Sequence, residues 1–275
     1  MNRLFVVNKP IFISSNFYLN RIKRKYKTKK AGFSGTLDPF ACGCLIVAFG
    51  QYSKLFRYLK KTPKSYRTTI FLGAQSDSLD IENITEVSAK CEVLSVKKIK
   101  EELQDLVGTL EYLPPKYSAK RINGQRAYDL VREGVDFELK KITSEIYDVK
   151  FINYSHPFIT FDITVSEGSY IRSIAQILLE KLGSYGTLSY LERLHEGEFF
   201  FNDEKALNPL KYLDLPTNTY TGTKEWFDLG KKLSIDYFEN KENGEYLITF
   251  DTFFAIVEIK ESEVKYILNK VLLND

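Results

Sequence analysis

The residue whose type and surroundings most suggest chemistry is Asp38, in the segment GTLDP at residues 35–39. It is the only acidic residue among the first 75, which contain fifteen lysines and arginines. A carboxylate among so many cations is expected to stay ionised. Such a group can act as a nucleophile, but an Asp before Pro in a glycine-rich turn is also an ordinary structural feature. Residue type and spacing alone leave both interpretations open.

Cysteine and histidine are too few for most metal or disulfide chemistry. Cys42, Cys44 and Cys91 form no C-x-x-C pair, so we expect neither a disulfide framework nor a structural zinc site. The only histidines, His156 and His195, exclude a histidine-rich metal site and leave few candidates for a Ser/His/Asp mechanism. We therefore expect a reaction that needs no metal ion.

The net charge of +3 conceals an uneven distribution of charge along the chain. Residues 21–30, RIKRKYKTKK, contain seven of the fifteen N-terminal cations, whereas residues 201–275 contain fourteen acids against nine lysines. A basic N-terminal surface is typical of nucleic-acid binding. The alternative is a solvated lysine-rich helix face, although the near absence of acids over 75 residues favours nucleic acid.

Hydrophobic patterning predicts helices and long strands without a regular alternation of the two. Short apolar or alternating runs indicate strands, and apolar residues at helical spacing indicate helices. This mixture favours an α+β fold, with helices flanking a largely antiparallel mixed sheet. We expect strands at 4–7, 44–49, 66–72, 142–154, 158–166 and 187–200, helices from Ser14 or Ser15 and at 53–61, 96–107, 124–132 and 171–182, and loops at 31–38 and 75–83.

A resemblance to a known family extends over roughly residues 3–200. The segment AGFSGTLDPFACGCLIVAFG at 31–50 resembles the catalytic loop of the bacterial TruB-type tRNA pseudouridine synthases, which isomerise the T-loop uridine of tRNA. Any one short motif is weak, but many in the family's order are not expected by chance. The others are KP at 9–10, SS at 14–15, KSYR at 64–67, PPKYSA at 114–119, GSYIRS at 168–173 and YLERL at 190–194.

The resemblance implies catalytic roles for Asp38, Tyr66 and Arg172. Asp38 would be the nucleophile, and Arg172 would pair with it, since a guanidinium orients a carboxylate and keeps it ionised. A cation in the first turn of a helix is disfavoured by the helix dipole, so Arg172 is in any case expected to have a specific partner. Tyr66 would stack on the flipped uracil, although an ordinary strand tyrosine fits its position too.

Four further residues are candidates for substrate binding. Leu191 matches a leucine that packs against the target base in the family, but could equally be core. Asp80 matches an acid that helps to organise the Asp–Arg pair, and a solvated loop Asp is the alternative. Lys9 is expected either to touch the RNA backbone or to hold the catalytic loop. Phe33 stands where the family usually has a histidine that stacks within the T-loop.

A second departure from the family pattern is Phe12, which stands where the family has a glycine. Glycine at that place suggests a backbone with positive φ, so we expect the local turn to differ. Phe33 can stack but cannot hydrogen-bond or ionise, so the histidine it replaces is not expected to be a required acid or base. Neither departure removes Asp38, Tyr66 or Arg172.

Composition, strand pattern and the resemblance together divide the chain into three parts. These are a catalytic domain at 1–208, a connection at 209–230, and a reduced PUA-like module at 231–275, where strands are expected at 246–250 and 253–259. The module has 45 residues, which is too few for a robust independent core, so we expect it to pack on the catalytic domain.

The function expected is therefore a tRNA pseudouridine synthase. Two alternatives stay open: a synthase with another target, such as ribosomal RNA, and an RNA-binding or RNA-folding protein with secondary catalysis. No apolar run approaches the roughly 20 residues that cross a membrane, and the N-terminal apolar stretch is too short for a signal peptide. We expect a cytoplasmic monomer that binds tRNA.

Overall fold

The central strands follow directly from apolar and alternating sequence. Strand β3 (Cys42–Phe49) is buried along nearly its whole length, and β4 (Lys64–Leu72) alternates buried and half-buried side chains from Tyr66 onward. The computed structural model describes residues 1–88, 91–122 and 124–273. Within these ranges the main sheet also contains β1 (Arg3–Lys9), β2 (Ala31–Ser34), β7 (Gly108–Tyr112), β10 (Ile142–Ser155), β11 (Phe158–Val165), β12 (Gly186–Glu196) and β13 (Phe199–Phe200).

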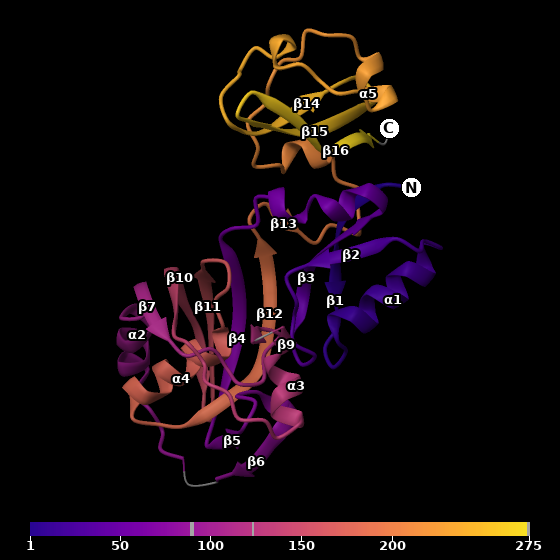
Figure 1. The fold of residues 1–275 in the computed structure, drawn as a ribbon. Helices are drawn as coiled ribbons and strands as arrows, with labels where there is room; N and C mark the ends of the chain where they lie inside the picture. The colour runs from indigo at the N-terminus through magenta and orange to yellow at the C-terminus, as the bar shows by residue number, and fades with distance from the viewer. Residues whose placement is uncertain (89–90, 123, 274–275) are drawn as a thin grey trace.

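The strands of this sheet are ordered β1-β3-β12-β4-β11-β10-β7, with β2 paired to β3 and β13 paired to β12. Their pairings are antiparallel except for a short parallel contact between β12 and β3. The predicted α+β fold with a largely antiparallel sheet is therefore confirmed (Figure 1).

Strand β3 creates a fork in the sheet. One of its edges pairs with β1 throughout. Its other edge pairs with β2 at residues 46–49 and with β12 at residues 42–43. The segment 35–41, which contains Asp38, therefore lies between the part of this edge that pairs with β2 and the part that pairs with β12. The predicted loop at 31–38 was wrong for 31–34, because these four residues pair with β3 and are too few to show a period.

Helices α2 (Val96–Gln104) and α4 (Ile171–Leu182) lie on the same side of the sheet in Figure 1 and contribute to one hydrophobic core. The predicted helix at 171–182 is confirmed, and Gly183 ends it in the left-handed conformation at φ 66°. The predicted start of helix α1 (Ser15–Lys25) is also confirmed, since the Ser14 hydroxyl accepts a hydrogen bond from the backbone N–H of Phe17.

The short helix predicted at 53–61 is instead a pair of 3₁₀ helices, η1 (Gly50–Lys54) and η2 (Phe56–Tyr58). Tyr52, Leu55 and Tyr58 are all buried here. Their spacing of three residues matches the 3₁₀ helix, which has three residues per turn, and not the α-helix. The burial pattern thus selects the tighter helix.

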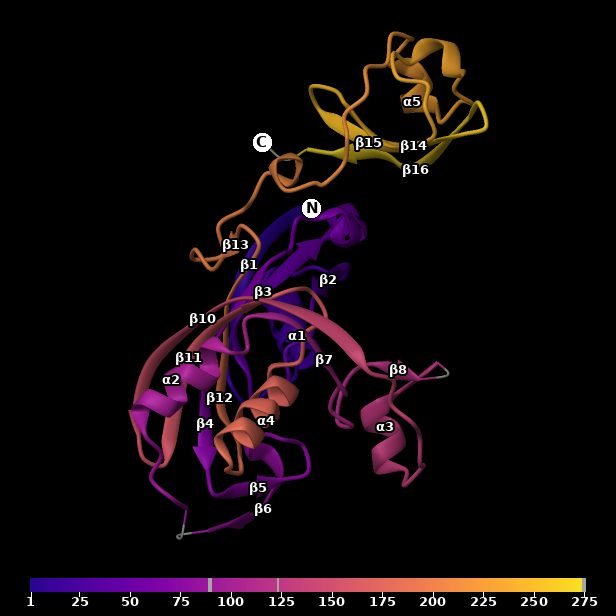
Figure 2. The ribbon, with the colours of Figure 1, turned by 90° about the vertical axis from the view of Figure 1, so that its left-hand side faces the viewer.

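Two small peripheral units extend from the main sheet. The first is α3 (Ala127–Arg132), which follows the hairpin of β8 (Arg121–Ile122) and β9 (Gln125–Arg126) and stands away from the body of the protein in Figure 2. The helix predicted from 124 thus begins only at Ala127. The second comprises β5 (Ala74–Ser76), η3 (Ile81–Asn83) and β6 (Ile84–Val87), where a polar loop was predicted.

The C-terminal residues form a three-stranded antiparallel sheet of β14 (Gly244–Thr249), β15 (Phe253–Lys260) and β16 (Glu263–Leu272). Sequence patterning predicted the first two strands and missed the third. Phe254, Ile256 and Val271 share a buried cluster with Leu4 and Ile46 of the main sheet, so this part packs on the rest of the chain. The segment before it contains η4 (Pro209–Lys211), α5 (Glu225–Leu229) and η5 (Ile235–Tyr237).

Candidate active site

A cavity of about 320 Å³ opens beside the fork in the sheet. Its walls come from the loop at 35–38, from β4 and β12, from the segment 119–120, and from the turn that leads into α4. Asp38, Tyr66, Arg172 and Leu191, which lie far apart in the sequence, all line it. The fold therefore brings the three predicted catalytic residues and one predicted substrate-binding residue into one site.

The Asp38 carboxylate is paired with the Arg172 guanidinium. Asp38 Oδ2 lies 2.9 Å from Arg172 Nη2. The side chain of Asp38 is 33% exposed, whereas that of Arg172 is only 4% exposed. The arginine is thus a fixed part of the wall, and the carboxylate is the member of the pair that a substrate can reach.

Three further acceptors hold the Arg172 guanidinium in place. Nη1 donates to the backbone carbonyl of Ser78 at 2.6 Å and to Asp80 Oδ2 at 3.1 Å. Nη2 donates to the backbone carbonyl of Tyr117 at 2.7 Å. Asp80 is itself fixed, because its other oxygen accepts from the Ser78 hydroxyl at 2.7 Å. The predicted arrangement, in which Asp80 organises the Asp38–Arg172 pair, has this geometric basis.

Opposing effects act on the ionisation of Asp38. Desolvation in the cavity raises the pKa of its carboxyl above the ordinary value, and the Asp80 carboxylate acts in the same direction. The Arg172 guanidinium and the Lys9 ammonium lower the pKa and so limit this rise. The basic sequence context led us to expect a firmly ionised carboxylate, but the pKa of Asp38 is raised. The cations offset only part of the cost of burial.

Lys9 is completely buried and contacts the loop that contains Asp38. Its ammonium group donates to the backbone carbonyls of Pro10 at 2.9 Å, Ile13 at 2.6 Å and Pro39 at 3.2 Å. Desolvation lowers the pKa of Lys9 to about 8, so the group is mainly protonated at neutral pH and all three donors are used. Of the two roles considered for Lys9, this geometry supports holding the loop.

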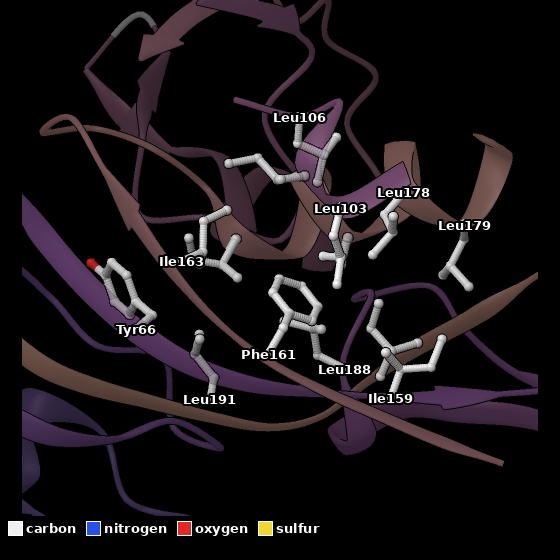
Figure 3. Packing of buried hydrophobic residues seen from close by; sticks show 14 of the residues in the cluster. Tyr66, Leu103, Leu106, Ile159, Phe161, Ile163, Leu178, Leu179, Leu188 and Leu191 are labelled. Carbon is white, nitrogen blue, oxygen red and sulfur yellow. The ribbon is translucent and has the colours of Figure 1, made fainter. Parts of the chain in front are cut away.

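Tyr66 and Leu191 form the apolar side of the cavity where it meets the hydrophobic core. Figure 3 shows Tyr66 at the edge of the core cluster, with its hydroxyl pointing away from the other labelled side chains and with Leu191 beside it. Both side chains are mostly buried. They offer a flat aromatic face and an aliphatic contact to a planar base entering the cavity.

The two departures from the family pattern lie outside this cavity. Phe33, in β2, packs against the cluster formed by β1, β3 and α1, and is not among the cavity-lining residues. Phe12 is exposed and has a φ of 59°. The expectation that Phe12 changes the local turn was wrong: the backbone adopts the positive φ that a glycine would favour, and the phenylalanine bears the strain.

Sequence reasoning missed a second buried charge cluster, formed by Arg193, Glu196 and Lys64. Glu196 is fully buried and lies 2.9 Å from Arg193 and 3.0 Å from Lys64. Arg193 also donates to the backbone carbonyls of Gly35 at 2.9 Å and Cys44 at 2.8 Å. Arg193 therefore fixes the backbone of the loop at 35–38, while Arg172 pairs with the Asp38 carboxylate of that loop. The sequence signal that could have revealed this cluster is the presence of Arg193 and Glu196 within one predicted strand, at 187–200.

Two further observations concern the described residues only. No group of three or more His, Cys, Asp or Glu side chains in the described ranges has an arrangement that could hold a metal ion. None of the helices in those ranges combines the length and the apolar character that a membrane-crossing helix requires.

A largely antiparallel sheet with an Asp–Arg pair in a cavity beside its central strands is the architecture that the sequence resemblance implied for a pseudouridine synthase. Residues 23–171 match the family described as TruB family pseudouridylate synthase (N terminal domain). The protein named tRNA pseudouridine synthase B from Sulfurovum sp. (strain NBC37-1) is 58% identical over 271 residues, which are 98% of each chain. The protein of the same name from Campylobacter concisus (strain 13826) is 52% identical and is covered to 99%. The chain therefore belongs to the TruB family of pseudouridylate synthases, and it is an isomerase.

The fold is shared with more distant solved structures. The crystal structure of a Cbf5-Nop10-Gar1 complex contains a chain that matches 98% of this one with a TM-score of 0.67 at 16% identity, over 84% of its own length. A structure of an H/ACA RNP bound to a substrate RNA containing 2'-deoxyuridine gives a TM-score of 0.62 at 17% identity, over 99% of this chain and 85% of that one. At this identity the likeness concerns the fold.

Proposed function

We propose that this protein converts the T-loop uridine of tRNA to pseudouridine, with Asp38 as the nucleophile. The observation on which this rests is the pairing of a partly exposed Asp38 carboxylate with a buried Arg172 in a cavity. Curated relatives that are 48–58% identical over almost the whole chain are named tRNA pseudouridine synthase B, which supports tRNA as the substrate.

The reaction breaks the bond between N1 of uracil and C1′ of ribose and forms a bond between C5 and C1′. C5 loses a proton and N1 gains one, so the conversion is an isomerisation without oxidant or reductant. The Asp38 carboxylate can begin it by adding to C6 of the ring or by assisting departure of the base at C1′. Tyr66 stacks on the uracil and places its phenol near C1′ of the ribose, where the C5 proton must be removed once C5 has bonded to C1′.

Binding requires the target uridine to leave its stack in the RNA loop. Flipping costs a few kcal/mol, which stacking in the cavity and contacts to phosphates offset. Helix α1 has Lys23, Arg24 and Lys25 in its last turn, and the cations that follow, Lys27, Lys29 and Lys30, are exposed. This basic segment provides phosphate contacts.

We further propose that the protein acts as a cytoplasmic monomer without a cofactor. We also propose that the 231–275 module is PUA-like and contributes little RNA contact because of its acidic balance.

The test uses an unmodified tRNA transcript with tritium at C5 of its uracils. Because C5 loses its hydrogen when it bonds to ribose, each isomerisation releases one tritium to water. We expect release of one equivalent per tRNA from the wild-type transcript. A matched transcript with cytidine in place of the T-loop uridine should release none. No release, or equal release from both transcripts, would refute the proposed target.

A further inference from the structure

Two lysines and one glutamate meet at the mouth of the cavity. Glu167 Oε1 lies 3.4 Å from Lys61 Nζ and 3.5 Å from Lys64 Nζ, so both ammonium groups approach the same oxygen. Lys64 and Glu167 line the cavity together with Asp38. Lys61 is anchored beside the catalytic loop by a hydrogen bond to the Ser34 hydroxyl at 3.2 Å. These three residues form what we call the rim cluster.

The members of the rim cluster differ strongly in burial. The side chains of Lys61 and Lys64 are 13% and 7% exposed, whereas that of Glu167 is 51% exposed. The lysines are therefore fixed parts of the protein wall. Glu167 lies in the turn between β11 and α4, and Gly168 follows it with a φ of 85° and open space where a Cβ would stand. A half-exposed glutamate in such a turn can rotate into solvent and regain rotamer freedom.

The charges of the rim cluster leave a cation without a permanent partner. Lys64 already has the buried Glu196 carboxylate at 3.0 Å, and Glu196 is shared with Arg193. Within the described residues, Glu167 is the only carboxylate that pairs with Lys61. Partial burial would raise the pKa of Glu167, but Lys64 and Lys61 outweigh this effect and hold its pKa below the ordinary value. The two lysines thus form an anion site that an internal carboxylate fills.

The chemistry of the substrate indicates what replaces that carboxylate. When a nucleotide flips into a cavity, the phosphodiesters on either side of its ribose stay at the cavity mouth. A phosphodiester has a full negative charge and two free oxygens, so it can accept from two ammonium groups that are both within reach of one carboxylate oxygen.

We propose that Lys61 and Lys64 bind a phosphodiester next to the flipped uridine, and that Glu167 occupies this site in the free protein as an internal competitor. The inference rests on the proposed function, because it assumes that an RNA nucleotide enters the cavity. Glu167 weakens RNA binding in exchange for keeping the buried lysines paired when no RNA is bound. Any other anion must also displace Glu167, but it gains no base stacking in the cavity to offset that cost.

The test measures the dissociation constant for unmodified tRNA transcript in full-length proteins that all contain Asp38→Asn, so that the RNA stays unmodified. Glu167→Gln should lower the dissociation constant about three- to ten-fold, the range expected for one or two partly exposed ion pairs. Adding Lys61→Met should abolish this gain. Glu180→Gln removes the same charge about 12 Å along α4 from Arg172 and should change nothing.

An unchanged dissociation constant in Glu167→Gln would overturn the proposal. A higher dissociation constant would overturn it too, because Glu167 would then itself contact the RNA. A gain that persists with Lys61→Met, or that Glu180→Gln reproduces, would also overturn it, since the effect would then come from net charge. The tritium assay on the wild-type protein is independent of this result. If it fails while Lys61-dependent tightening is observed, the phosphate site stands and the T-loop assignment falls; the opposite pair of results rejects the phosphate site alone.

Discussion

Arg172 and Arg193 are both buried cations at the same cavity, but they face different kinds of partner. Arg172 pairs with Asp38, whose side chain is one-third exposed, and with the buried Asp80. Arg193 pairs with the fully buried Glu196 and donates to two backbone carbonyls. Both act on the loop at 35–38, one through its carboxylate and the other through its backbone. Burial of a charge therefore does not by itself mark a reactive site: of these two arginines, only Arg172 has a partner carboxylate, Asp38, that a substrate can reach.

The largest effect is expected from Asp38→Asn, which changes the accessible partner of Arg172 and leaves the partners of Arg193 intact. The amide is nearly isosteric but cannot act as a carboxylate nucleophile, so turnover should fall by at least about 10⁴-fold. Binding of unmodified tRNA and the midpoint of chemical unfolding should be retained. Tritium release and a binding titration on the same preparation measure both. Significant turnover by this variant would refute the nucleophilic role.

Arg193→Met should act mainly on stability. It leaves Glu196 buried with Lys64 as its remaining cation, and removing one partner of a buried ion pair costs about 3–5 kcal/mol. Chemical denaturation would measure the free energy of unfolding. Adding Glu196→Gln should restore part of the loss, because it removes a buried charge that has lost one of its two cations. A variant as stable as the wild type would show that the second cluster does not hold the loop.

Arg172→Lys should act mainly on rate. Lysine keeps the charge but cannot hold two carboxylates and two carbonyls in one plane, so kcat/KM should fall by about 10²-fold. The loss of stability should be smaller than for Arg193→Met. The comparison between the two arginines would be broken if Arg172→Lys destabilised the protein as much as Arg193→Met while leaving kcat unchanged.

The smallest effect expected is a shift of the pH profile. The pKa of Asp38 is raised by desolvation and by Asp80, so as pH falls, kcat/KM should decline at a higher pH than an ordinary Asp (about 3.9) would give. Asp80→Asn removes a negative charge beside Asp38 and should move this acidic limb to lower pH. Arg193→Lys keeps its charge and should leave the limb in place. An acidic limb that does not respond to Asp80→Asn would mean that Asp38 is not the titrating group.

The two arginines also differ in how far sequence predicts them. Asp38 and Arg172 could be predicted because each lies in a short motif and because a cation at a helix N-terminus calls for a partner. The Lys64–Glu196 pair could not, because these residues are 132 positions apart in the sequence and face each other only through the register of β4 and β12. Register depends on the whole sheet and not on local pattern.

The same limit applies to the fold. Helix α4 and its end at Gly183 follow from local spacing, and the sequence predicted both with the bounds that the structure shows. Strand β2 exists only because β3 offers a free edge beside it, and β16 only because β15 does. Local sequence also could not place Lys9, whose ammonium group is held by two carbonyls of the turn after β1, Pro10 and Ile13, and by that of Pro39 from a distant loop.

The proposed target and nucleophile can be examined together by mapping pseudouridines at nucleotide resolution in a mixture of unmodified tRNA and ribosomal RNA transcripts. Wild-type protein and Asp38→Asn would be compared side by side. We expect a single new pseudouridine, in the T-loop of tRNA, made by the wild-type protein only. Product in ribosomal RNA alone, no product from the wild-type protein, or the same product from Asp38→Asn would contradict this expectation.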